Sequence, residues 1–106
     1  MEVSAWRNGQ HSANTMYGLT IPRSARDRFF DWSWWEVIVI LPNGDEATAS
    51  LRPTFWATCS ELRGAGIGRW LRSEGLAPWP KGAPPRFELM PLGENRFDVS
   101  RPDALS

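Results

Sequence analysis

Two stretches of this chain combine arginine with amide and hydroxyl side chains, and acidic residues are nearly absent from both. Residues 3–26 contain three arginines and no acid, and residues 47–73 contain four arginines and one glutamate. Each stretch carries a net charge of +3, although the whole chain of 106 residues is neutral. Charge segregated in this way can present a positive face to a polyanion. The chemistry that this pattern favours is therefore the binding of phosphates.

The kind of basic residue points in the same direction. Arginine supplies eleven of the twelve basic side chains, and Lys81 is the single lysine. The rigid guanidinium fork forms paired hydrogen bonds with phosphate oxygens or with the edge of guanine. A GC-rich genome would also raise arginine at the expense of lysine, so composition alone leaves both explanations open. The placement of the arginines in two stretches favours nucleic acid.

The residue types between the arginines match the edges of bases. Asparagine and glutamine pair with adenine, arginine pairs with guanine, glutamate accepts from cytosine, and serine or threonine accommodates several bases. The candidate base contacts in the first stretch are Arg7, Asn8, Gln10, His11, Asn14 and Thr15. Those in the second stretch are Trp56, Thr58, Ser60, Glu61 and Arg63. The candidate phosphate contacts, at the bases of the two loops, are Arg23 and Arg52.

Each of these side chains also has an ordinary structural explanation. The amides are common turn formers, and Thr58 and Ser60 could cap the turn that follows them. Arg63 could pair with Glu61, and Trp56 could pack at the base of its loop. Arginines 69 and 72 are expected on a solvated helix face, with phosphate contact as the alternative. Only the whole set taken together supports binding.

A catalytic site is hard to assemble from this sequence. His11 is the single histidine, and its stretch holds no acid that could orient it toward Ser12 or Cys59. One cysteine and one histidine cannot complete the four ligands of a zinc site, and a lone cysteine forms no internal disulfide. The glycine-rich run at residues 64–68 lacks the Gly-Lys-Ser/Thr ending of a phosphate-binding loop. We expect a binding domain without catalytic residues, metal or cofactor.

Short strands and helices must hold the two polar stretches in place. Hydrophobic alternation and turn residues predict strands at residues 2–6, 16–21, 34–41, 47–52, 86–91 and 96–100. Short helices are predicted at residues 23–30 and 67–73. The first polar stretch becomes a loop between two strands, residues 53–65 become a polar excursion, and residues 77–85 become a proline-rich connector. These elements predict an α+β, mainly β domain built on a small, partly open barrel.

Length and composition set the wider boundaries. The chain is long enough for one domain, at residues 1–100, followed by a polar tail at residues 101–106 that we expect to be disordered. No apolar run approaches the roughly 20 residues of a membrane span, and the start shows no signal-peptide pattern. We therefore expect a cytoplasmic protein that does not bind membranes.

One segment resembles a known family. Tyr17-Gly18-Leu19-Thr20-Ile21-Pro22-Arg23, followed by Ala25 and Phe29-Phe30, resembles the strand, Ile/Leu-Pro-basic turn and short helix of the B-three DNA-binding domain. That family is a seven-stranded open pseudobarrel with two short helices, found in plant transcription factors and in the recognition domains of some type II restriction endonucleases. The resemblance spans roughly Ala5–Val99. Residues 7–15 correspond to the family's N-terminal arm, and residues 55–63 correspond to its C-terminal arm.

The resemblance implies a function and a partner. A member of the family binds double-stranded DNA as a monomer, with both arms in the major groove. The arginine bias and the connector at Leu76–Pro85 differ from plant members, and they favour a bacterial, restriction-enzyme-like member. A nuclease domain would then belong to a longer protein. The alternatives are a stand-alone bacterial DNA-binding regulator, a protein-interaction module rich in tryptophan and proline, a small hydrolase using His11, and a single-strand binder with exposed tryptophans.

Overall fold

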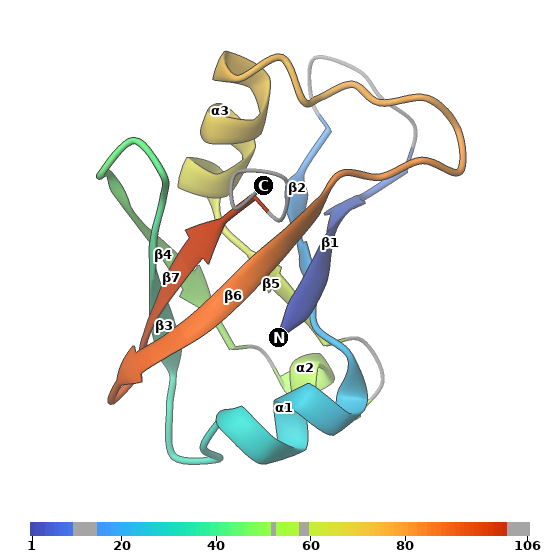
Figure 1. Cartoon of the computed structure of the whole chain (residues 1–106). Coiled ribbons are helices and arrows are strands. Elements are labelled where there is room, and N and C mark those ends of the chain that lie inside the picture. The colour runs from blue at the N-terminus through green and yellow to red at the C-terminus, as the bar shows by residue number, and fades with distance from the viewer. Residues whose placement is uncertain (10–14, 52, 58–59, 102–106) are drawn as a thin grey trace.

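Apolar residues alternate along most of the strands, and this alternation closes the sheet around a single core. The computed structural model of the chain describes residues 1–9, 15–51, 53–57 and 60–101. Within them, seven strands form a closed barrel in the order β1-β2-β5-β4-β3-β7-β6 (Figure 1). The strands are β1 Glu2–Arg7, β2 Tyr17–Thr20, β3 Glu36–Ile40, β4 Glu46–Ser50, β5 Glu61–Arg63, β6 Arg86–Gly93 and β7 Arg96–Ser100.

The pairing of the strands leaves no break in the described barrel. The neighbouring strands are antiparallel except β3 and β7, which run parallel. The pairing of β1 with β6 joins the two ends of the sheet. The mainly β barrel predicted from the sequence is therefore confirmed, and it is closed where a partly open barrel was expected.

In the described part of the chain, three short helices cover the two ends of the barrel (Figure 1). The helices α1 Arg23–Phe29 and α2 Pro53–Ala57 lie at one end, and α3 Ala65–Ser73 lies at the other. Phe30, which follows α1, stacks on Phe97 of β7 with 4.8 Å between ring centres, and lies 5.2 Å from Phe55 of α2. These aromatic contacts seal the end of the core next to α1 and α2.

The sequence predicted two helices, and the structure shows that the count was wrong. The helices predicted at residues 23–30 and 67–73 correspond to α1 and α3, but α2 and β5 lie in the segment that was expected to be a polar excursion. Phe55 and Leu62 are the reason, because each is at most 1% exposed and fills the core. The short apolar run at residues 55–57 and the single Leu62 give no periodic signal, so the pattern of the sequence could not reveal these elements.

The glycine-rich run at residues 64–68 serves close packing. A Cβ atom at Gly64 would lie 2.5 Å from the carbonyl oxygen of Thr48, and one at Gly66 would lie 3.0 Å from the Cβ of Ala47. These glycines therefore allow the start of α3 to approach β4 closely. This steric role accounts for the run without a bound phosphate.

Two further expectations concern the termini and membranes. Residues 102–106, which include most of the tail predicted to be disordered, lie outside the described residues. None of the helices in the described part of the chain is both long and apolar enough to cross a bilayer.

Candidate nucleic-acid interface

A row of outward-facing residues crosses four neighbouring strands, β1, β2, β5 and β4. Trp6 pairs with Gly18, Gly18 with Arg63, and Arg63 with Ser50. Their neighbours along the same strands are buried in the core: Ala5, Leu19, Leu62 and Ala49. Since side chains alternate between the two faces of a strand, the row points away from the core. We call Trp6, Gly18, Arg63 and Ser50 the outer row.

Arg63 is held at the centre of the outer row by two contacts. Its guanidinium carbon lies 4.5 Å from the centre of the Trp6 ring, a cation–π contact. Its Nη2 donates to Oε1 of Glu61 at 3.2 Å. The Arg63 side chain is 29% exposed, whereas that of Glu61 is only 9% exposed. The structural pairing of Arg63 with Glu61 is therefore confirmed, and the guanidinium stays accessible above it.

Trp6 is a member of this site that sequence reasoning missed. It belongs to a predicted strand in which Val3 and Ala5 face the core, so its outward orientation followed from alternation alone. Its contact with Arg63 did not follow, because it depends on β2 lying between β1 and β5. The signal for this contact that the sequence did offer was an outward-facing tryptophan within the first positive stretch.

The loop of the first polar stretch leaves the barrel directly after the β1–β2 pairing ends. The backbone N–H of Asn8 donates to the carbonyl of Met16 at 2.9 Å, and Arg7 Nη1 donates to the carbonyl of Gly9. The side chain of Asn8 is exposed. Thr15 is only 9% exposed. It therefore lies in the interior, although the sequence predicted that it contacts DNA. Three further predicted contacts lie outside the described residues: Gln10, His11 and Asn14.

Two exposed arginines of α3 border the base of this loop. Arg72 Nη2 donates to the carbonyl of Thr15 at 3.2 Å, and its guanidinium carbon lies 5.1 Å from the centre of the Tyr17 ring. Arg69 and Arg72 line a hollow of about 270 Å³ together with Met16. The α3 end of the barrel therefore carries positive charge beside the first polar stretch.

Two predicted contacts of the second stretch, Trp56 and Ser60, lie at the opposite end of the barrel from α3. Trp56 of α2 stacks on Trp32, with 4.5 Å between ring centres and 14° between ring planes. The packing alternative for Trp56 is therefore the one that the structure shows. Ser60 is 7% exposed, and its hydroxyl donates to the carbonyl of Ile21 at 2.5 Å. Ser60 therefore attaches this segment to the end of β2, although the sequence predicted that Ser60 contacts DNA.

Arg26 carries one of the charges of the first stretch, and the fold uses it internally. The residue is 9% exposed, and its Nη1 donates to the carbonyls of Phe55 at 3.1 Å and Trp56 at 2.8 Å. A cation is favourable at the carbonyl end of a helix, so Arg26 stabilises the end of α2. This role could not be predicted, because α2 itself gave no signal in the sequence.

The predicted contacts therefore form two groups at opposite ends of β2 and β5, with Glu61 and Arg63 on β5 between them. Arg7 and Asn8 lie at the α3 end, and Trp56 lies at the α1 end (Figure 1). The outer row and the second outward pair, Thr20 with Glu61, span the distance between them. Because β5 has three residues and β2 has four, the two groups are separated by roughly 10–13 Å along the strands. Arg23 is exposed on α1, and Arg52 and Thr58 lie outside the described residues.

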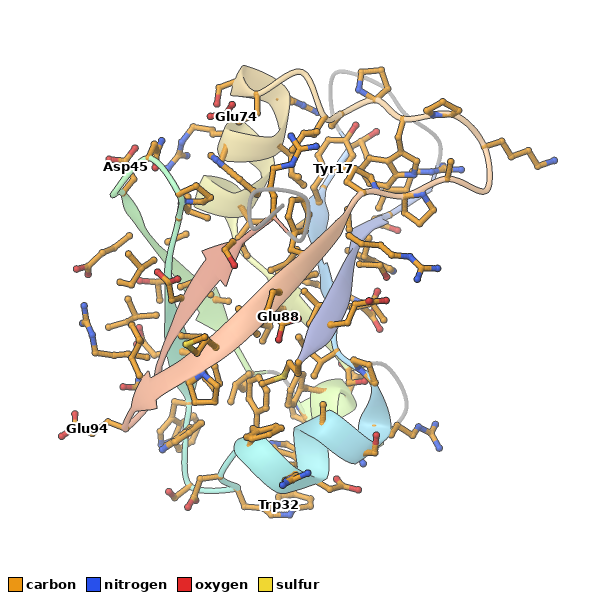
Figure 2. All side chains as sticks on the ribbon, viewed as in Figure 1. Tyr17, Trp32, Asp45, Glu74, Glu88 and Glu94 are labelled. Carbon is orange, nitrogen blue, oxygen red and sulfur yellow. The ribbon has the colours of Figure 1, made fainter. Side chains whose placement is uncertain are left out.

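Acidic side chains lie both next to the outer row and away from it, since Glu61 bonds Arg63 and Glu36 pairs with Ser50 in the β3–β4 register. The labelled Asp45, Glu74, Glu88 and Glu94 lie on turns, at the end of α3 and on β6 (Figure 2). Two further acids form exposed ion pairs, Glu2 with Arg86 at 2.9 Å and Glu46 with Arg96 at 3.1 Å. The segregation of charge seen in the sequence is thus partly kept in three dimensions.

No cluster of metal-ligating side chains occurs among the described residues, and His11 and Cys59 lie outside them. The chain matches no protein-family model, no curated protein and no solved structure. What it can bind must therefore be inferred from its own geometry.

Proposed function

We propose that this domain binds double-stranded DNA through the outer row, with the β1–β2 loop at one end of the contact and the α2–β5 segment at the other. The observation that carries the proposal is the position of Arg63. Its guanidinium is fixed by Trp6 and Glu61 at the centre of a strand face that separates two polar, acid-poor segments. One N–H of the group donates to Glu61, and an arginine side chain has five N–H donors.

A guanidinium fixed in this way suits recognition of a base edge or a phosphate. Its planar fork bonds O6 and N7 of guanine, or two phosphate oxygens, in a single plane. A side chain positioned on a strand is also held more firmly than one on a loop. Asn8 at one end would contact base edges, while Arg69 and Arg72 would contact phosphates without reading sequence.

The resemblance to the B-three domain supports the same function. The expected strand, proline turn and helix occur as β2, Pro22 and α1, and the seven strands form a barrel as the family would require. We propose that the chain is a bacterial member of this family and the target-recognition domain of a restriction endonuclease, acting as a monomer. A stand-alone regulator is the alternative, and it would differ in lacking a nuclease partner.

The experiment is selection from a randomised duplex library at two salt concentrations, with sequencing of the bound fraction. We expect enrichment of a short motif and an affinity that falls steeply with salt, because phosphate contacts release counterions. Salt-sensitive binding without enrichment would reduce the domain to a non-specific binder. Absence of duplex binding at both salt concentrations would contradict the proposal.

Two arginine variants test the assignment of the face. Arg63→Ala should weaken or broaden the enriched motif. Arg96→Ala is the matched control, because that arginine forms an exposed ion pair with Glu46 on β4 and belongs to β7, which does not neighbour β1, β2 or β5. Equal effects of both variants would mean that another face binds DNA.

A further inference from the structure

A hollow lined by tryptophan lies beside α1 and α2, and its lining contains no residue of the outer row. Its volume is about 450 Å³, and its lining includes Trp32, Trp34, Trp35, Trp56, Leu51 and Pro53. Trp32 is 76% exposed and Trp35 is 87% exposed. Large apolar side chains gathered on a surface and left exposed are typical of binding sites.

A hydrogen-bonded turn builds one wall of the hollow. Asp31 Oδ1 accepts from the N–H of Ser33 at 2.8 Å and from its hydroxyl at 2.6 Å, and the N–H of Trp34 donates to the carbonyl of Asp31 at 3.1 Å. Trp34 packs edge-on against Phe30 and Phe97, each with 6.1 Å between ring centres. The turn is thereby anchored to the core.

The indole of Trp32 packs on another ring, whereas the indole of Trp35 is exposed to solvent. Trp56 stacks on one face of Trp32, so the second face of Trp32 stays open. The exposure of Trp35 leaves both of its faces accessible. The hollow thus offers one aromatic face, that of Trp32, that is already positioned before a ligand arrives.

The charges around the hollow favour a cation. In the described chain, the charged residues next in sequence to its lining residues are Asp31 and Glu36, both exposed. Hydrogen bonds from Ser33 hold the pKa of Asp31 below its ordinary value, so its carboxylate is ionised at neutral pH. Arg26, on the neighbouring helix, lies 5.6 Å from the centre of the Trp56 ring, but it is buried and its charge is bonded to Asp27 and to two carbonyls. Aromatic faces carry the negative part of the ring quadrupole, which adds to the attraction of the carboxylates.

We propose that this hollow binds an alkylated ammonium group, of the kind carried by choline or by a methylated lysine. Such a group has apolar methyls that pack on indole faces, and its charge interacts with the rings and with Asp31 and Glu36. A simple ammonium would suit the hollow less well, because it lacks the methyl groups that pack on the indole faces. The proposal does not rest on DNA binding, because none of the lining residues of the hollow belongs to the outer row or to α3.

A matched pair of small molecules tests the role of charge. Choline and 3,3-dimethyl-1-butanol have the same shape, but only choline is charged. We expect choline to shift a subset of the indole N–H resonances in an NMR titration and to bind about tenfold more tightly than the neutral compound. Equal binding of the two, or no shift with choline, would overturn the proposal.

Variants of the chain locate the site. Trp32→Ala and Trp35→Ala should each weaken choline binding by about tenfold. Trp79→Phe is the control, because Trp79 packs 5.4 Å from Tyr17 at the α3 end. Asp31→Asn keeps the acceptor for Ser33 and removes the charge, so it should weaken binding several-fold. Unchanged affinity in both tryptophan variants, with folded spectra, would overturn the proposal.

Two further arms distinguish the sources of the ligand. A peptide with trimethyllysine that binds more tightly than choline would identify a methylated protein as the source, whereas equal affinity would identify a small molecule. A concentration-dependent shift of the Trp35 indole without any ligand would show that a second copy of the chain covers the hollow, and this would contradict the proposal.

Discussion

The guanidinium of Arg63 reaches across Gly18 to the ring of Trp6, with 4.5 Å between the guanidinium carbon and the ring centre. A Cβ atom at position 18 would collide with the backbone carbonyl of Leu62, so only glycine fits between the two side chains. The ion pair with Glu61 holds the same guanidinium from a second side. A fork restrained in this way loses little conformational freedom when it binds a ligand.

The first prediction concerns Arg63 itself. Arg63→Ala should relax preference at one base pair of the selected motif and cost about 1–3 kcal/mol of binding free energy. The reason is the loss of paired hydrogen bonds to one base edge. Binding isotherms on the motif and on its single-base variants would measure this. A uniform loss on all sequences would instead identify Arg63 as a phosphate contact.

The second prediction concerns the contact between Trp6 and Arg63. Trp6→Leu should weaken DNA binding in the wild type, by about 0.5–1 kcal/mol, because it removes an exposed cation–π contact that positions the arginine. In the Arg63→Ala background the same change should have little effect, so the double-mutant cycle should show coupling. Additive losses in the cycle would mean that Trp6 contacts DNA on its own.

Some of these relationships were accessible from the sequence and others were not. The strands with regular alternation and the helices α1 and α3 were predicted, because their apolar residues repeat with the period of each element. The links that matter most for the site depend on register. Trp6 and Arg63 lie 57 positions apart, and only the insertion of β2 between β1 and β5 brings them together.

The predicted contacts show the same limit. Thr15 and Ser60 have the residue types of a DNA contact, but each lies in the interior. The hydroxyl of Ser60 bonds a carbonyl of Ile21, 39 positions away. Residue type indicates what a side chain can bond, whereas the fold decides whether its partner is another part of the chain or a ligand.

The third prediction separates phosphate contacts from base contacts. Arg69 is exposed on α3 and lines the hollow beside the first polar stretch. Arg69→Ala should weaken binding about equally on all duplex sequences and reduce the slope of log K against log salt by about 1. Affinities at four salt concentrations would measure the slope. A change in the selected motif would be inconsistent with a phosphate contact.

The fourth prediction concerns stability. Arg26→Met keeps much of the length of the side chain but removes two hydrogen bonds from a charged donor to the end of α2. We expect a loss of about 2–4 kcal/mol in the free energy of unfolding, because the two carbonyls lose a charged partner. Urea denaturation would measure it. Arg28→Met, an exposed arginine on the same helix, is the control and should change stability by less than about 0.5 kcal/mol.

The fifth prediction concerns pH and the turn that carries Trp32. Hydrogen bonds from the hydroxyl and the N–H of Ser33 lower the pKa of Asp31 below its ordinary value of 3.8. Because the pKa in the folded state is lower than in the unfolded state, the ionised carboxylate stabilises the fold fully above about 3.8, and this stability is lost as the pH falls through the lowered pKa. Asp31→Asn keeps the acceptor and cannot ionise. The difference in urea midpoint between wild type and Asp31→Asn should therefore be constant near neutral pH and shrink below pH 3.8. A difference that does not change down to the acid transition would show that the charge of Asp31 contributes nothing to the turn.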